Sequence, residues 1–143
     1  MAIESEPRLT SRGETVVRIA SAADIVTARQ HGRELAAELG FSRSDQTVIA
    51  TAISELARNI LEYAMLGDIE VAEMHRGARS GLLIVARDRG PGIPDVGQAL
   101  QDGYSTGRGL GIGLPGVRRL MDEFEIASEA GRGTRVTARK WLP

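Results

Sequence analysis

The 143-residue sequence contains no cysteine, and this absence excludes several kinds of site. Thiolate catalysis, a disulfide framework and cysteine-based zinc fingers all require that residue. A zinc centre built on histidine is also disfavoured, because the two histidines, His31 and His75, lie far apart in the chain. A chain of this length can bury about 68–70% of its unfolded surface. We therefore expect a fold that depends on an ordinary hydrophobic core.

Lysine is almost as scarce as cysteine. Among the 18 Lys+Arg residues, the single lysine is Lys140. A P-loop lysine is thus absent, and Lys140 lacks the surrounding sequence of the strand lysine of eukaryotic-type protein kinases or of a Schiff-base lysine. A site for phosphate groups in this chain has to use backbone N–H groups, arginine or a metal ion.

Aromatic residues make up 3% of the chain, and the formal net charge is −1. Nucleic-acid binding favours a basic face and stacking aromatic rings, so we expect no nucleic-acid partner. No apolar run approaches the roughly 18 residues of a membrane span, and the N-terminus lacks the apolar region of a signal peptide. The expected protein is cytoplasmic, with no membrane association.

Hydrophobic periodicity predicts an alternation of strands and helices in one domain. Residues 1–14 are polar and aperiodic, so we expect a flexible tail there and a single domain over residues 15–143. The expected elements are a strand at 15–19, a helix from Ser21 to Gly40, a helix from Ser42 or Ser44 to about Ala64, strands at 67–76 and 82–88, a glycine-rich loop at 90–116, a helix at 114–124 with Pro115 near its start, and strands at 123–130 and 134–141. This order predicts an α+β two-layer sandwich, in which helices cover one face of a mixed, mostly antiparallel sheet.

Two polar residues on the second expected helix are candidates for chemistry. Glu55 and Asn59 are four residues apart, so they project from the same side of the helix. That side borders the apolar stripe of the helix rather than joining it. A solvated polar edge is one interpretation of the pair. A general base and a metal ligand is the other.

The second candidate lies where an apolar strand ends at Asp88 and continues into Arg89-Gly90-Pro91-Gly92. An aspartate followed by glycines is often a simple turn. Two glycines with an interleaved proline specify the backbone beyond the needs of a turn, however. The functional interpretation is a carboxylate that accepts from an exocyclic amine, beside glycines that let a flat ring approach the backbone.

The glycine-rich loop is the third candidate. Gly111, Gly113 and Gly116 formally match the dinucleotide fingerprint G-x-G-x-x-G, but a polar segment precedes them where a Rossmann fold needs a strand. Alternating glycines that lead into a helix N-terminus instead suit an anion, through free N–H groups and the helix dipole. The later stretch Gly131-Arg132-Gly133-Thr134 needs no function on its own, since it reads as a hairpin turn.

Together and in this order, these motifs resemble those of a known superfamily. SELARN, DRGPGIPD, GLGIGLPGVRRLMDEF and GRGT resemble the N box, G1 box, G2 box and terminal Gly-Thr element of the Bergerat-fold (GHKL) ATPases and kinases. Within this superfamily the chain is similar to the RsbT-type serine kinases, the switch proteins of bacterial stressosome partner-switching pathways. DIVTARQHGRELAAELGF and the C-terminal KWLP are similar to that type too. The resemblance covers roughly residues 15–143.

The resemblance implies a Bergerat fold that binds ATP and Mg²⁺ under a mobile lid at about residues 95–113. Glu55 would be the general base and Asn59 the Mg²⁺ ligand. Asp88 would hold the adenine amino group, and Gly90 and Gly92 would shape its pocket. Thr134 would support Asp88 and the adenine, and the phosphates would be wrapped by Gly109, Gly111 and Gly113. The N box often ends in a His-Ala or His-Gly step, where this chain has Glu62-Tyr63-Ala64, so no role is assigned there.

The same resemblance implies a protein serine/threonine kinase that phosphorylates a serine, or in second place a threonine, of a STAS-domain antagonist. The kinase would then bind and activate a phosphatase. A polar tail and one strand before the first helix do not provide the phosphoacceptor hairpin of a sensor histidine kinase. Two alternatives stay open, namely an ATP-binding sequestration module in the manner of anti-sigma factors and, more distantly, a Rossmann oxidoreductase. The intact Glu55 favours the kinase.

Overall fold

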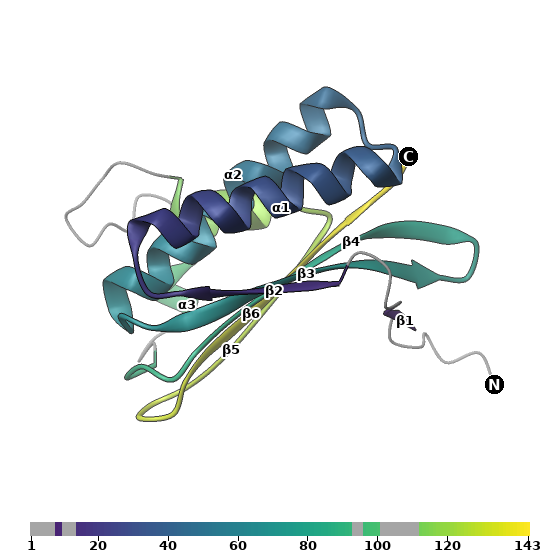
Figure 1. Cartoon of the computed structure of the whole chain (residues 1–143). Coiled ribbons are helices and arrows are strands. Elements are labelled where there is room, and N and C mark those ends of the chain that lie inside the picture. The colour runs from purple at the N-terminus through teal and green to yellow at the C-terminus, as the bar shows by residue number, and fades with distance from the viewer. Residues whose placement is uncertain (1–7, 10–13, 93–95, 101–111) are drawn as a thin grey trace.

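The computed structural model describes residues 8–9, 14–92, 96–100 and 112–143, which form one sheet with helices packed against it (Figure 1). The strands are β1 (Arg8–Leu9), β2 (Thr15–Ile19), β3 (Gly67–Arg76), β4 (Arg79–Asp88), β5 (Glu123–Glu129) and β6 (Gly133–Trp141). The helices are α1 (Ala22–Leu39), α2 (Arg43–Tyr63), α3 (Val96–Ala99) and α4 (Gly113–Leu120).

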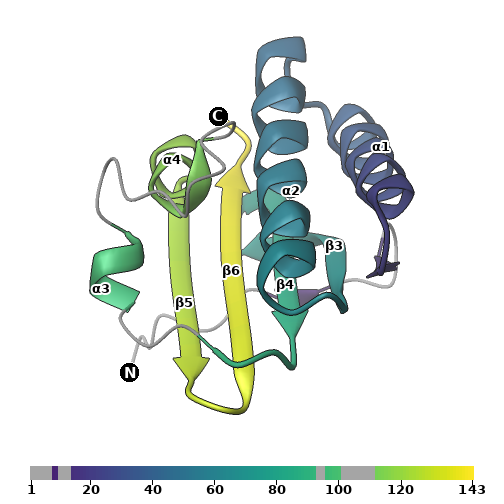
Figure 2. The same cartoon turned by 90° about the vertical axis from the view of Figure 1, so that its left-hand side faces the viewer.

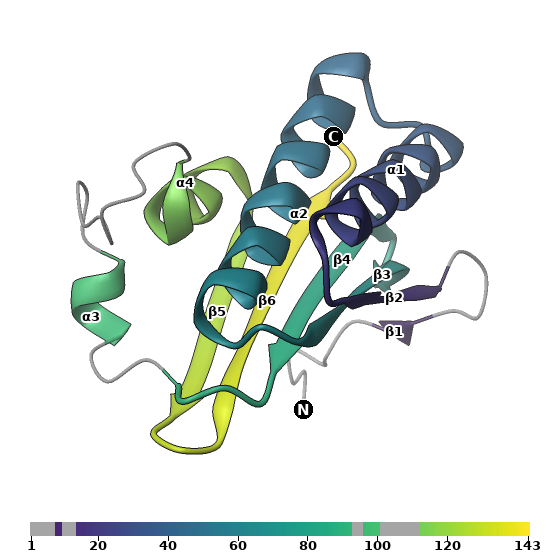
Figure 3. The ribbon, with the colours of Figure 1, turned by 60° about the vertical axis from the view of Figure 1, so that its left-hand side comes forward.

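The sheet has the strand order β1-β3-β4-β6-β5, and β2 also pairs with β3. Every pairing among the described strands is antiparallel. Figures 2 and 3 show α1, α2 and α4 on the same face of this sheet, while its other face carries no helix of the described chain. The architecture confirms the expected α+β two-layer sandwich.

Both long helices begin at residues that the sequence marks as caps. The Asp24 carboxylate accepts from the N–H of Ala20 at 2.8 Å and from that of Ser21 at 3.0 Å. The bond from Ala20 is the main reason why the pKa of Asp24 lies below its ordinary value. Ser42, rather than Ser44, caps α2, since its Oγ accepts from the N–H of Asp45 at 3.1 Å.

The main core lies between the helices and the sheet. Ile49, Ile53, Leu56 and Ile60 form the buried stripe of α2, as the periodicity predicts. At Gly32 on α1, an added Cβ would lie 2.0 Å from Ile53 Cδ1, so the absence of a side chain there lets the two helices pack closely. A smaller buried cluster of Met74, Leu83, Val85 and Trp141 lies apart from this core.

The last helix is shorter than the sequence predicts. α4 ends at Leu120 instead of reaching Phe124, and Met121 already has an extended backbone. Phe124 belongs to β5, where it pairs with Ala138. Pairing with β6 therefore overrides the helical pattern of this segment. Pro115 lies at the third position of α4, which begins at Gly113.

Other differences concern short elements. β4 begins at Arg79 rather than at residue 82, because the turn that separates it from β3 comprises Gly77 and Ala78 alone. The sequence did not predict α3. Arg8 and Leu9, inside the expected tail, pair with His75 and Met74 of β3. The remaining tail up to residue 13 and most of the expected lid lie outside the described residues, so both stay predictions.

Candidate active site

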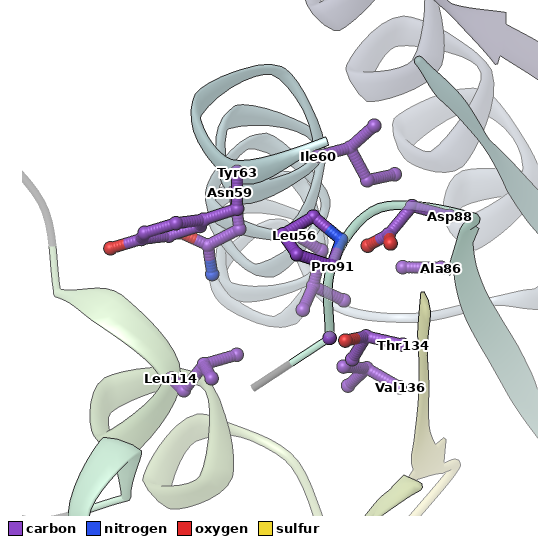
Figure 4. Close-up of a pocket in the computed structure, with 11 residues that line it drawn as sticks. Leu56, Asn59, Ile60, Tyr63, Ala86, Asp88, Pro91, Leu114, Thr134 and Val136 are labelled. Atoms are coloured by element: carbon purple, nitrogen blue, oxygen red, sulfur yellow. The ribbon is translucent and has the colours of Figure 1, made fainter. Parts of the chain in front are cut away.

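A small pocket lies where α2 and α4 face the ends of β4 and β6 (Figure 4). Its described lining residues are Leu56, Asn59, Ile60, Tyr63, Ala86, Asp88, Pro91, Gly92, Leu114, Thr134 and Val136. Apolar side chains form most of this wall, and a few polar groups interrupt it. An apolar hollow with a small number of placed polar groups is the usual form of a ligand site.

Asp88 supplies the carboxylate of the pocket. It is the last residue of β4 and pairs with Gly67 on one side and with Thr134 on the other. Its Oδ1 accepts from the N–H of Gly90 at 2.9 Å. Within the described part of the chain Oδ2 has no hydrogen-bond donor, so this oxygen can accept from the amine of a ligand.

Glycines make the close packing of the loop after Asp88 possible. A Cβ on Gly90 would lie 2.6 Å from the Cβ of Ala64, at the end of α2. A Cβ on Gly92 would lie 2.6 Å from the carbonyl oxygen of Glu129. The absence of a side chain at both residues therefore allows the loop to pack closely at the pocket, and Gly92 also lines the pocket.

Gly133 is a further residue on which the pocket depends, although the sequence suggested only a hairpin turn there. Its φ of +114° is rarely adopted by residues with a side chain, and an added Cβ would lie 2.1 Å from the carbonyl oxygen of Asp88. The GRGT motif was a signal for it, but the close approach to Asp88 is visible only in the folded chain.

We expect Gly133→Ala to lower the free energy of unfolding by about 1–3 kcal/mol, since the new methyl group needs a strained backbone and pushes Asp88 away. Nucleotide affinity should fall with it. Gly131→Ala is the matched control, because Gly131 also has a positive φ (79°) but a Cβ there meets nothing within 4 Å. Urea unfolding of the two variants measures the difference. Equal losses would show that strain alone, without contact to Asp88, determines the effect.

Thr134 contributes through its position rather than through a bond to Asp88. Its Oγ1 lies 2.9 Å from Ser128 Oγ, a hydrogen bond that joins β6 to β5. No hydrogen bond between the Thr134 and Asp88 side chains occurs in the described residues. In the described residues, Thr134 meets Asp88 through the backbone pairing of β6 with β4, and its supporting role stays a prediction.

Glu55 lies one helical turn before Asn59 on α2, and it is 7% exposed. This is deeper than the helix edge that the periodicity predicts, because the start of α4 covers it. Its Oε2 accepts from the N–H of Gly113 at 3.4 Å, and its Oε1 pairs with Arg58 Nη1 at 2.5 Å. The sequence had assigned no role to Arg58.

The structure thus brings together most of the expected site residues. Asn59, Asp88, Gly92 and Thr134 line one pocket, and Gly90 holds the loop at its rim. Glu55 and Gly113 are hydrogen-bonded to each other beside this pocket, and the residues that follow them in the chain, Leu56 and Leu114, line its wall. Gly109 and Gly111 lie outside the described residues.

Tyr63 lines the pocket one turn beyond Asn59, and Figure 4 shows its ring beside the Asn59 side chain. Sequence reasoning left it without a role, and its spacing from Asn59 was the signal that could have found it. No group of three or more histidine, aspartate or glutamate side chains gathers in the described residues to hold a metal ion. Likewise, no helix of the described chain is long and apolar enough to cross a membrane.

Comparison with known proteins identifies the family. The model of the histidine kinase-like ATPase domain matches residues 19–140. The serine/threonine-protein kinase RsbT of Bacillus subtilis is 55% identical over 129 residues, which are 90% of this chain and 97% of that protein. An anti-sigma F factor of Halalkalibacterium halodurans is 32% identical over 74% of this chain and 76% of its own length.

A solved structure gives the same result for the fold. The RsbU and RsbW domains of a Mycobacterium tuberculosis protein match with a TM-score of 0.57 and 26% identity, over 90% of this chain and 33% of that one. This chain thus spans about a third of the solved chain. The resemblance inferred from the four motifs is confirmed. The chain belongs to the histidine kinase-like ATPase domain family and, within it, to the RsbT-type serine/threonine-protein kinases.

Proposed function

We propose that this chain transfers the γ-phosphate of Mg-ATP to a serine of a STAS-domain antagonist, with Glu55 as the general base. The observation that carries the proposal is the position of Glu55. Glu55 is a buried carboxylate on α2, one helical turn from Asn59. It accepts from the N–H of Gly113, the first residue of α4, and lies next to the pocket that holds Asp88. With adenine at Asp88, the γ-phosphate of the nucleotide would lie near Glu55, where a general base could take the proton of the acceptor serine.

The pocket suits adenine at its Asp88 end. The free Oδ2 of Asp88 accepts from the amino group of the base, and the apolar wall contacts the ring faces. The described residues enclose about 40 Å³, which is enough for part of a purine ring. The ribose and phosphates would extend past Leu114 toward Gly113 and Glu55. There the N–H groups at the start of α4, together with Gly109 and Gly111, would meet the phosphates.

Magnesium fits the donor set near Asn59. Mg²⁺ commonly keeps several waters and takes one or two protein oxygens together with substrate phosphates. An amide oxygen at the pocket edge, without a cage of carboxylates, agrees with that pattern. When bound, the ion neutralises charge on the phosphates, a task for which this chain offers no P-loop lysine.

The partners are proposed from the relatives. The relatives are a serine/threonine-protein kinase, anti-sigma F factors and a protein with RsbU and RsbW domains, and the first two names point to proteins as partners. We propose a cytoplasmic protein that leaves its phosphorylated antagonist and then binds and activates a phosphatase. A sequestration module with little transfer activity is the competing function, since it would use the same pocket.

The direct test is incubation of the purified chain with γ-labelled ATP, Mg²⁺ and a STAS-domain antagonist. Label on a serine of the antagonist, and none when Mg²⁺ is chelated, supports the proposal. ATP-dependent binding of the antagonist without transfer of label would instead establish the sequestration module.

We expect Asn59→Ala to fold normally but to lose Mg²⁺-dependent nucleotide binding and phosphoryl transfer, each by about tenfold or more. Calorimetry with ATP, with and without Mg²⁺, measures the change. The control is Gln30→Ala, which removes an exposed amide on α1 far from the pocket. Intact Mg²⁺-dependent binding in Asn59→Ala would remove Asn59 from the metal site.

A further inference from the structure

A second and larger hollow lies on the face of the sheet that carries no helix. Its floor is a cross-strand row in which Arg18 of β2 pairs with Asp68, Asp68 with Arg87, and Arg87 with Arg135 of β6. The neighbouring residues Ile69, Ala86 and Val136 belong to the main core under the helices. Because successive side chains of a strand point to opposite faces, the row lies on the other face. We call this hollow the arginine groove.

The arginine groove has a volume of about 1140 Å³ and an excess of positive charge. Five arginines line it, against three carboxylates, although the whole chain carries a net charge of −1. Arg87 pairs with Glu70 at 2.8 Å and with Asp68 at 3.4 Å. Arg18 and Arg135 form no ion pair within 4 Å in the described part of the chain, although the charge of Arg18 contributes to the lowered pKa of Asp24 at the start of α1.

The pairing of Arg87 with Arg135 is unfavourable on its own. Like charges directly opposite each other on neighbouring strands destabilise a sheet. Glu70 and Asp68 compensate the charge of Arg87, whereas Arg135 is exposed and forms no ion pair in the described part of the chain. Departures from local rules without local compensation are expected at functional positions. An anionic partner placed over this pair would supply the missing charge.

The edge of the arginine groove is apolar. Val16 is 58% exposed and Leu66 is 45% exposed, and both line the groove. Met65, next to Leu66, is 78% exposed and has a positive φ of 68°, which is uncommon for a residue with a side chain. Exposed apolar side chains beside unpaired charges are typical of a protein contact. None of the groove's described lining residues is aromatic, which disfavours single-stranded nucleic acid.

The arginine groove shares Asp88 and Thr134 with the wall of the nucleotide pocket but lies away from Glu55, which is at the acceptor end of the active site. Ala64 lines the groove, while Glu55 lies nine residues earlier on α2, which is about 14 Å along the helix axis. The groove also opens on the opposite face of the sheet. A segment bound there would leave Glu55 accessible to a phosphoacceptor.

We propose that the arginine groove binds an acidic, extended segment with apolar side chains, which belongs to a protein partner other than the phosphoacceptor. The distinction between this partner and a phosphoacceptor rests on the proposed function. The charge and shape of the groove are independent of that function. The row from Arg18 to Arg135 crosses three interstrand spacings, or about 14 Å. An extended segment of about five residues spans that distance.

The test uses the full chain and a fluorescein-labelled octapeptide of alternating glutamate and valine, with a lysine-valine octapeptide as its counterpart. We expect fluorescence anisotropy to show that the chain binds the acidic peptide but not the basic one, and that added salt weakens this binding. The double variant Arg18→Glu/Arg135→Glu should lose at least tenfold in affinity. Arg18→Lys/Arg135→Lys should retain most of it. Arg43→Glu reverses an exposed arginine at the start of α2 and should change nothing.

ATP affinity and phosphoryl transfer, measured in the same variants, should stay at wild-type values. If the wild-type chain transfers no phosphoryl group, the proposed function is contradicted, but binding of the acidic peptide to the groove is still tested. Absence of peptide binding, or an equal loss in Arg43→Glu, would overturn the inference. So would stronger binding to phosphatidylserine vesicles or oligo-dT than to the peptide. A chain without residues 1–7 that binds the peptide tenfold more tightly would assign the groove to its own acidic N-terminus instead.

Discussion

Replacing Glu55 with glutamine is expected to slow phosphoryl transfer by about 10²–10⁴-fold and to leave Mg-ATP affinity unchanged. A general base removes the hydroxyl proton as the serine attacks, so it acts in the transition state and not in nucleotide binding. Glutamine keeps the size of the side chain, but its single amide oxygen can accept from only one of Arg58 and Gly113, the two described partners of Glu55. The change therefore removes the basicity and one of these two hydrogen bonds, while the shape of the side chain stays the same. Single-turnover labelling of the antagonist, beside calorimetry with ATP, measures both quantities.

Glu38→Gln is the matched control, because Glu38 is an exposed carboxylate on α1. Its transfer rate should equal that of the wild type. Glu55→Gln should still capture the antagonist and, since the antagonist stays unphosphorylated, should fail to reach the phosphatase. A wild-type transfer rate in Glu55→Gln would show that Glu55 is not the base.

Asp88→Asn is expected to weaken ATP binding by about 10- to 150-fold, the equivalent of the 1.5–3 kcal/mol of a hydrogen bond to a charged group. The structure specifies how the loss arises. Oδ1 of Asp88 accepts from Gly90, and an asparagine that keeps this bond turns its NH₂ group to the place of Oδ2. Two donors then face each other, the amide of the protein and the amine of adenine.

This geometry also predicts a change in nucleotide preference. Inosine triphosphate has a carbonyl oxygen in place of the amine, so Asp88→Asn should bind it relatively better than the wild type does. Asp45→Asn, on a half-buried carboxylate in the first turn of α2, is the control. Unchanged ATP affinity in Asp88→Asn, measured by calorimetry, would remove Asp88 from the site.

Helix ends were predictable because their causes are local. Asp24 accepts from backbone N–H groups at the start of α1, Ser42 accepts from the N–H of Asp45 at the start of α2, and Gly40 ends α1 with a φ of 96°. The end of α4 was not predictable in this way. Its last expected turn competes with a strand partner, Arg139, that lies outside any local window. The free energy of sheet pairing decides such a competition.

The same distinction separates the parts of the site. The sequence by itself determined the order of the motifs, the residue types at Glu55, Asn59 and Asp88, and the family that they indicate. Only the tertiary structure decided that α4 buries Glu55 and that Gly133 presses on the Asp88 backbone. It also decided that arginines from three strands meet in one row, which Arg18 and Arg135 enter from opposite ends of the chain. Strand register creates that proximity, and register depends on every pairing in the sheet at once.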